Sequence, residues 1–173
     1  MLAAYAKGAP VRIIGSTMTG VDDIFMYAKA GSPIKTAKDM AGKNVAFSSI
    51  GASTHAIVLG FKKTYGIDFK AIPLGPPVAT MTQAMTGQVD VGWTVVPLGL
   101  KEIDEGKIHM VARANEVPEL RDQSIRITAV TARTLAERRD VLVRWLRAYR
   151  EGVDFLYGGD DGIAAYSKYS GVE

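Results

Sequence analysis

The chain has 173 residues, of which 47% are hydrophobic and 8% aromatic, a composition typical of a globular protein and not of a disordered or fibrous one. The absence of cysteine excludes a disulfide framework, a thiolate metal site and a cysteine nucleophile. The net charge of +3 comes from 21 basic and 18 acidic side chains without a nucleic-acid-reading motif, so we expect no nucleic-acid partner.

Short apolar runs alternate with helical patterns along the first three quarters of the chain. Strands are expected at residues 10–16, 24–28, 44–47, 69–74, 88–93, 108–112 and 125–130. A short helix is expected after Thr36, and a longer one follows Ser53 and ends at Gly66. Two further helices are expected at 78–86 and 97–105. The alternation predicts an α/β fold with a parallel or mixed sheet and helices on both faces.

The longest predicted helix lies in the last quarter of the chain. Thr134 is expected to cap it, with Glu137 three residues on, and Gly158 and Gly159 are expected to end it. Its apolar residues recur at helical spacing: Leu142, Trp145, Leu146, Tyr149, Val153 and Leu156. The arginines of this region predict a solvated helix face. One more helix is expected at 160–169.

The loop from Ser48 to Thr54 is the most informative feature for function. Serines, a threonine and a glycine lie where a strand passes into a helix, so hydroxyls and unpaired N–H groups would converge at the positive end of the helix dipole. This arrangement predicts an anion pocket. The structural alternative is that Ser53 or Thr54 is an ordinary N-cap and Gly51 a turn residue.

Three other places follow predicted strands, where ligands of α/β proteins bind. Trp93 ends one strand, and its indole is expected either in the core or stacked on a ligand. Gly75 lies in a Gly-Pro-Pro turn that is either rigid structure or a point of close backbone approach. Ser16 and Thr17 follow the first strand in a hydroxyl-rich loop, for which a plain surface loop is the alternative.

Catalytic and metal-binding patterns are absent from the sequence. His55 lies in the first turn of the Ser53 helix, where it could donate to a ligand, and His109 lies in an apolar strand where core packing or solvation explains it. Neither has a carboxylate or second histidine at metal-ligand spacing, and no nucleophile elbow, Walker loop or dinucleotide fingerprint is present. We therefore expect no enzyme activity, no metal and no cofactor.

Several runs of the chain resemble a known family in their order and spacing. Residues 39–55 (DMAGKNVAFSSIGASTH), 73–75 (PLG) and 84–91 (AMTGQVDV) are similar to the solute-binding proteins of ABC transporters, as are 6–14 and 32–36 upstream. The branch is the one that takes nitrate, sulfonate, taurine and pyrimidine precursors, the NMT1 or thiamine-pyrimidine-like proteins. The resemblance covers nearly the whole chain.

The resemblance implies a type 2 periplasmic-binding-protein fold with two α/β lobes that close on a ligand, one lobe nearly complete and the other partial. Residues 1–30 would form part of lobe 1, residues 31–124 lobe 2 with the crossing segments, and residues 125–173 the return to lobe 1 with a strand and the long helix. The ligand-binding residues that it implies, together with those argued above, are Ser16, Thr17, Ser48, Ser49, Gly51, Ser53, Thr54, His55, Gly75 and Trp93.

The implied function is that of the substrate-binding component of an ABC importer for a small anionic or polar solute, periplasmic and served by a permease in the full-length context. Members carry an export signal and further elements at both ends, and residues 1–8 show no signal pattern. We therefore expect a chain shortened at both ends, whose exposed sheet edge is covered by a second copy. The alternatives are the effector-binding domain of a transcriptional regulator and an enzyme of the thiamine-pyrimidine type.

Overall fold

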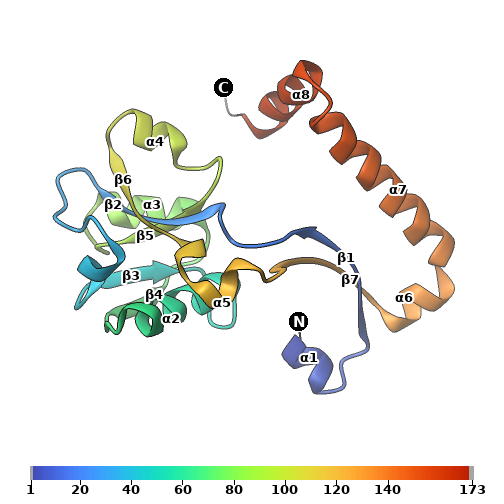
Figure 1. Ribbon diagram of the computed structural model, residues 1–173, viewed down its shortest axis with the longest axis horizontal. Helices are drawn as coiled ribbons and strands as arrows, with labels where there is room; N and C mark the ends of the chain where they lie inside the picture. Colours follow the sequence, from blue (N-terminus) through green and yellow to red (C-terminus); the bar gives the residue numbers. More distant parts are fainter. Residues whose placement is uncertain (1, 172–173) are drawn as a thin grey trace. The chain divides into compact units, whose positions relative to one another are not determined.

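The computed structural model describes residues 2–171, which form two compact units (Figure 1). The first unit is built from the two ends of the chain, up to Ser16 and from Ile127 onward, and the second unit is Thr17–Arg126. The strand β2 (Ile24–Lys29) therefore lies in the second unit, whereas we expected the first thirty residues to stay together. The reason is its central position in a sheet, where it pairs on both sides.

The second unit alternates strands and helices as the sequence predicts. Its elements after β2 are η1 (Ala37–Met40), β3 (Asn44–Phe47), α2 (Ser53–Tyr65), β4 (Lys70–Pro73), α3 (Pro77–Met85), β5 (Gly92–Val95), α4 (Leu100–Asp104), β6 (Ile108–Arg113), η2 (Ala114–Glu116) and α5 (Pro118–Arg121). Local signals explain several ends. Gly66 ends α2 in the left-handed conformation, at φ 63°, and Pro77 opens α3 at a position where its missing N–H costs nothing.

The strands of the second unit form two groups that a single bridge connects. β2 lies between β5 and β6 and is antiparallel to both, whereas β3 and β4 are parallel. A parallel bridge joins Val45 to Val91, just before β5 begins, and the N–H of Ala46 donates to the Val91 carbonyl at 2.8 Å. The predicted strand 88–93 is therefore wrong in its bounds, because only the segment from Gly92 on pairs regularly with β2. The presence of both antiparallel and parallel pairs agrees with the mixed sheet, one of the two sheet types that the sequence predicts.

The helices of the second unit cover both faces of these strands. Tyr27 Oη lies 3.4 Å from the hydroxyl of Thr80, which places α3 against one face. The ring of Phe47 stacks on His55, which places the first turn of α2 against β3 on the other face (Figure 1). The largest fully buried side chains between these layers include Tyr27, Phe25, Phe61, Met26, Met40 and Ile57. All hydrophobic side chains that are buried in the described residues belong to this unit.

The first unit consists of two strands and four helices. They are α1 (Leu2–Ala6), β1 (Val11–Met18), β7 (Arg126–Thr131), α6 (Ala132–Glu137), α7 (Arg139–Leu156) and α8 (Asp160–Ser170), with the last residues of β1 and the first residue of β7 counted in the second unit. The helix expected at 160–169 is confirmed as α8. The first strand runs on to Met18, so the prediction of a loop at Ser16 and Thr17 is wrong.

The predicted cap of the long helix is also wrong. The side chain of Thr131 caps α6 by accepting a hydrogen bond from the N–H of Thr134 at 3.0 Å, and Thr134 therefore lies inside the first turn. The chain leaves helical geometry at Arg138, where φ is −129°, and the long helix α7 begins at Arg139. The capping pattern identified a real helix start but was assigned to the wrong threonine.

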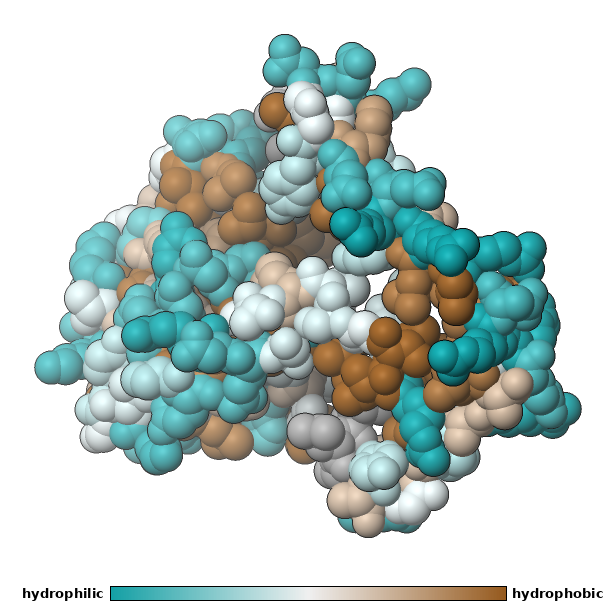
Figure 2. Space-filling model, turned by 45° about the vertical axis from the view of Figure 1, so that its right-hand side comes forward, coloured by the Kyte–Doolittle hydropathy of each residue, from teal (hydrophilic) through white to brown (hydrophobic). Residues whose placement is uncertain are grey.

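Hydrophobic side chains of the first unit remain open to solvent. No residue of α7 is buried, and Trp145 and Tyr149 are 44% and 38% exposed although their rings stack 5.6 Å apart. The space-filling view shows hydrophobic residues at the surface beside hydrophilic ones (Figure 2). Among the described helices, none combines the length and apolar character that a membrane span requires.

Candidate functional site

The N-terminus of α2 is open, which makes it the centre of the candidate site. Its N-cap residue is Ala52, which has no side chain that could accept a hydrogen bond, so the interpretation of Ser53 or Thr54 as the N-cap is wrong. The N–H groups of His55 and Ala56 turn back to the Ala52 carbonyl. Within residues 2–171, the N–H groups of Ser53 and Thr54 have no hydrogen-bond acceptor. Two donors therefore point out of the positive end of a 13-residue helix.

The side chain of Thr54 holds the preceding loop in place. It is buried, at 4% exposure, and its hydroxyl oxygen accepts a hydrogen bond from the N–H of Ser48 at 3.0 Å. The two hydroxyl oxygens of these residues also lie 2.6 Å apart. On its other side, the Ser48 carbonyl accepts a hydrogen bond from the N–H of Gly75 at 2.9 Å. Ser48 is thus fixed between α2 and the turn that follows β4.

His55 is fixed on the opposite side of the same loop. Its Nδ1 accepts a hydrogen bond from the N–H of Gly51 at 3.2 Å, and its ring stacks on Phe47 with centroids 4.8 Å apart. A nitrogen that accepts a hydrogen bond carries no proton, so in the neutral ring the proton lies on Nε2. The site thereby keeps a ring N–H donor. Sequence reasoning missed Phe47, whose stacking depends on a partner eight residues further on.

The remaining hydroxyls of the loop are not used within the fold. Ser49 is exposed and Ser53 half-buried, and in the described part of the chain neither side chain makes a hydrogen bond. Gly51 adopts φ +84°, a conformation that glycine takes without strain and that turns the loop toward α2. The structure therefore brings together the loop residues with Gly75, all at one end of β3 and β4.

Trp93 lies beside this group but inside the core. Phe47 and Trp93 each follow the bridged pair Val45 and Val91 by two residues, so both lie near the same end of neighbouring strands. Gly92 and Tyr27, which are paired, lie on the α3 face, so Trp93 points to the α2 face. The side chain is 8% exposed, which agrees with the core alternative. Its indole nitrogen is the one buried side-chain N or O atom of the described residues that has no hydrogen-bond partner.

Ser16 and Thr17 lie in different compact units, on either side of the boundary in β1. The Thr17 hydroxyl donates to the Arg126 carbonyl at 3.2 Å, which ties β1 to β7. Arg126 in turn donates from Nη1 to the Asp23 carboxylate at 2.9 Å. This ion pair was not predicted, because its partners are more than a hundred residues apart in sequence. The membership of Ser16 and Thr17 in a common ligand site remains a prediction.

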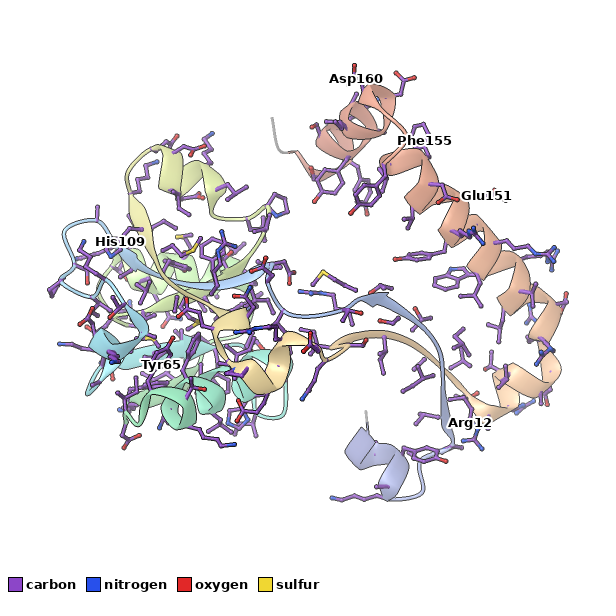
Figure 3. The ribbon with its side chains drawn as sticks, in the orientation of Figure 1. Arg12, Tyr65, His109, Glu151, Phe155 and Asp160 are labelled. Carbon is purple, nitrogen blue, oxygen red and sulfur yellow. The ribbon has the colours of Figure 1, made fainter. Side chains whose placement is uncertain are left out.

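The second histidine has a structural partner. His109 lies in β6 and is half-buried (Figure 3), and its Nε2 is 2.7 Å from the Ile34 carbonyl, so the ring has a hydrogen-bond partner within the fold. Over residues 2–171, no three His, Asp or Glu side chains gather closely enough to hold a metal ion. The chemistry that the candidate site offers is hydrogen-bond donation from N–H groups and hydroxyls.

Comparison with known proteins identifies a family and a fold. The family model described as "NMT1/THI5 like" matches residues 1–161. The chain is similar to the periplasmic aliphatic sulphonate binding protein SsuA from Escherichia coli, with a TM-score of 0.75 and 22% identity. It is also similar to the alkanesulfonate-binding protein SsuA from Xanthomonas axonopodis pv. citri, solved with MOPS bound, with a TM-score of 0.83 and 20% identity. No curated protein matches the sequence.

These similarities extend over nearly all of this chain but not over all of its relatives. In both comparisons 98% of this chain is covered, and the chain spans 58% of the length of the SsuA proteins. A sulfonate-binding protein from Methylobacillus flagellatus KT gives a TM-score of 0.66 at 16% identity, with 91% of this chain and 47% of that one covered. The predicted class, an α/β fold of the periplasmic-binding-protein type that is only partly represented, is confirmed.

Proposed function

Because the chain belongs to the NMT1/THI5-like family, we propose that it is the solute-binding component of an ABC importer, or a large part of one, and that it takes a small anionic solute without chemically altering it. The observation that carries this proposal is the open N-terminus of α2, where the N–H groups of Ser53 and Thr54 lack acceptors in the described chain. A helix N-terminus with free N–H groups and no competing cap favours an anion.

The geometry of the loop supports a sulfonate as the solute class. A sulfonate presents three acceptor oxygens, and the loop offers two free N–H groups together with the unused hydroxyls of Ser49 and Ser53. Charge-assisted hydrogen bonds of this kind are roughly twice as strong as neutral ones. The loop residues 48–54 include no lysine or arginine, so on this side the anion would be bound by the helix dipole and by hydrogen bonds.

The proposed compartment and the proposed protein partner rest on the similar solved structures. The proteins from Escherichia coli and Methylobacillus flagellatus KT are described as periplasmic, and sulfonate binding is what their names state. We infer the same compartment for this chain and a permease as its protein partner. The two units would then act as the two lobes, with residues 17–126 as lobe 2, and β1 and β7 as the crossings.

We propose that a second copy of the chain packs against the first unit and covers its exposed hydrophobic side chains. Among the described strands, β1 and β7 pair only with each other, which leaves one open edge on each. The first half of α7 carries three arginines and Asp140, a net charge of +2, whereas the second half carries Arg150, Glu151 and Asp154, a net charge of −1. A two-fold contact between antiparallel α7 helices would therefore place unlike charges opposite each other and cover the exposed Trp145 and Tyr149.

The solute-binding proposal is tested with a panel of ethanesulfonate, taurine, nitrate and a neutral pyrimidine, by thermal shift and calorimetry. The decisive variants are Ser53→Ala, which removes the hydroxyl, and Ser53→Pro, which also removes the N–H. Proline is well tolerated at the first position of a helix, and Ala52 already has the extended conformation, ψ 167°, that a following proline requires.

We expect ethanesulfonate to bind, Ser53→Ala to weaken binding about tenfold and Ser53→Pro to weaken it further without loss of stability. Thr64→Ala, near the other end of α2, is the matched control and keeps full affinity. Equal affinity of Ser53→Pro and the parent would remove the α2 N-terminus from the site. Failure of every solute in the panel to bind would overturn the proposed function.

The proposed contact between copies is tested separately by light scattering. The parent protein is expected as a dimer, and Trp145→Lys as a monomer, because a charge would enter the apolar contact. Ser167→Lys, on α8, serves as the control that stays dimeric. A parent protein that remains monomeric at high concentration would contradict this contact and leave the solute site unaffected.

A further inference from the structure

The indole N–H of Trp93 is a buried donor without an acceptor. The side chain is 8% exposed, its Nε1 is covered, and no described residue accepts a hydrogen bond from it. A buried indole donor left without an acceptor destabilises the folded chain relative to a paired one. Tryptophan therefore carries a penalty here that phenylalanine would avoid.

The neighbours of Trp93 explain why an acceptor is missing. On the α3 face, the main chain of Trp93 is satisfied, since its carbonyl accepts a hydrogen bond from the Thr80 hydroxyl at 2.9 Å. Trp93 and Phe47 each lie two residues beyond the bridged pair Val45 and Val91, at the same end of neighbouring strands, and the Phe47 ring stacks on His55. The missing acceptor is not supplied by the core around it.

The position of Trp93 connects this donor with the candidate site. Phe47 is followed directly by Ser48, so Trp93 lies at the same end of the neighbouring strands as the loop that leads to the free N–H groups. The helix N-terminus and the orphan indole donor are independent observations, and both require an acceptor from outside the described chain. An oxyanion satisfies both requirements.

We propose that Trp93 is a specificity-determining residue of the solute site, and that its indole N–H donates a hydrogen bond to an oxygen of the bound anion. The proposal rests on the proposed function. Nε1 is covered in this structure, and the proposed hydrogen bond requires the loop 48–52 to move aside as the solute binds. A solute without an acceptor at this point leaves the donor unpaired and is bound less tightly, which discriminates against it.

The chain offers a direct test, because it contains only two tryptophans. In a ¹⁵N-labelled sample they give two indole N–H signals, which Trp145→Phe assigns. Saturation with ethanesulfonate is expected to move the Trp93 proton signal downfield, as a new hydrogen bond does, while the Trp145 signal stays in place. This measurement uses the unaltered protein, so it does not depend on whether a variant folds.

The affinity of Trp93→Phe for ethanesulfonate completes the test. The variant keeps an aromatic ring but loses the donor, and we expect affinity to fall about tenfold while Trp145→Phe binds as the parent does. Normal affinity of Trp93→Phe, or a Trp93 signal unmoved by bound ethanesulfonate, would overturn the role of Trp93 and leave the solute site standing. A parent protein that binds no solute would overturn both.

Discussion

The hydroxyl oxygen of Thr54 accepts the backbone N–H of Ser48 at 3.0 Å, across the loop that joins β3 to α2. This bond determines the shape of the candidate site, because it takes up the one buried hydroxyl of the loop and holds Ser48 against α2. Thr54 consequently contributes its N–H to the site and uses its side chain for the fold. Sequence reasoning had assigned this side chain to the ligand.

Thr54→Val is expected to destabilise the second unit and to weaken solute binding. The valine has nearly the same shape but leaves the Ser48 N–H without an acceptor, at a cost of about 1–3 kcal/mol in the free energy of unfolding. Thr54→Ser keeps the oxygen and is expected to lose less than about 1 kcal/mol. Urea unfolding monitored by fluorescence measures both. Equal stability of the two variants would show that the hydroxyl does not hold the loop.

Stability is expected to fall at alkaline pH through two tyrosines. The hydrogen bond from Tyr65 Oη to Glu116, 2.7 Å long, raises the pKa of Tyr65 from 10.0 to about 12, and burial raises the pKa of Tyr27 to about 12. Between pH 10 and about pH 12, the unfolded chain releases the two tyrosine protons that the folded chain retains. The free energy of unfolding is therefore constant with respect to these groups below about pH 10 and decreases as pH rises toward 12.

Tyr65→Phe separates the two contributions, because it removes the hydroxyl that donates to the Glu116 carboxylate. Urea unfolding between pH 9 and pH 11.5 is expected to show a shallower decline in the variant than in the parent. Glu116→Gln, which keeps an acceptor but removes the charge, is expected to lie between them. The same slope in all three proteins would contradict the role of this contact.

Asp39 is expected to stabilise the second unit at neutral pH but not in acid. Its carboxylate accepts hydrogen bonds from the N–H of Lys35 at 3.0 Å and from the N–H and hydroxyl of Thr36, and these bonds hold its pKa below the ordinary value of 3.8. The folded state therefore binds fewer protons than the unfolded state in this range. The contribution is present above about pH 4 and is lost as pH falls through the folded-state pKa.

Asp39→Asn is expected to lower the midpoint temperature of unfolding at pH 7, and the difference from the parent should vanish near pH 2. Asp122→Asn is the control, since its exposed carboxylate accepts no hydrogen bond from a described residue. Differential scanning calorimetry across this pH range provides the comparison. A deficit of the Asp39 variant that is the same at every pH would indicate a steric cause.

Gly92→Ala is expected to be among the most damaging single substitutions in the second unit. A methyl group there would collide with the fully buried ring of Tyr27, which can move only by displacing α3, and overpacking of this kind costs about 3 kcal/mol or more. Gly152→Ala, in the open middle of α7, is the matched control and should gain about 0.5–1 kcal/mol of helix stability. Circular dichroism with thermal melting distinguishes the two.

Local patterns in the chain were sufficient for most element positions. The apolar run of β2 and the αL glycine at the end of α2 depend on neighbours in sequence, and both were predicted within a residue or two. Thr36 and Asp39 lie three residues apart, so their contact was visible as a spacing. Errors arose where two local signals competed, as with Thr131 and Thr134 at the start of α6.

The contacts that shape the site depend on residues that sequence spacing cannot pair. Spacing and residue type established an α/β chain with a hydroxyl-rich loop at a helix start, because periodicity and turn chemistry are properties of neighbouring residues. Only the tertiary structure determines that the Thr54 hydroxyl accepts the Ser48 N–H and that the Trp93 indole N–H has no acceptor. It also determines that Asp23 forms an ion pair with Arg126, more than a hundred residues away in sequence. Long-range packing selects these partners, and the free energy of a buried polar group depends on which partner it meets.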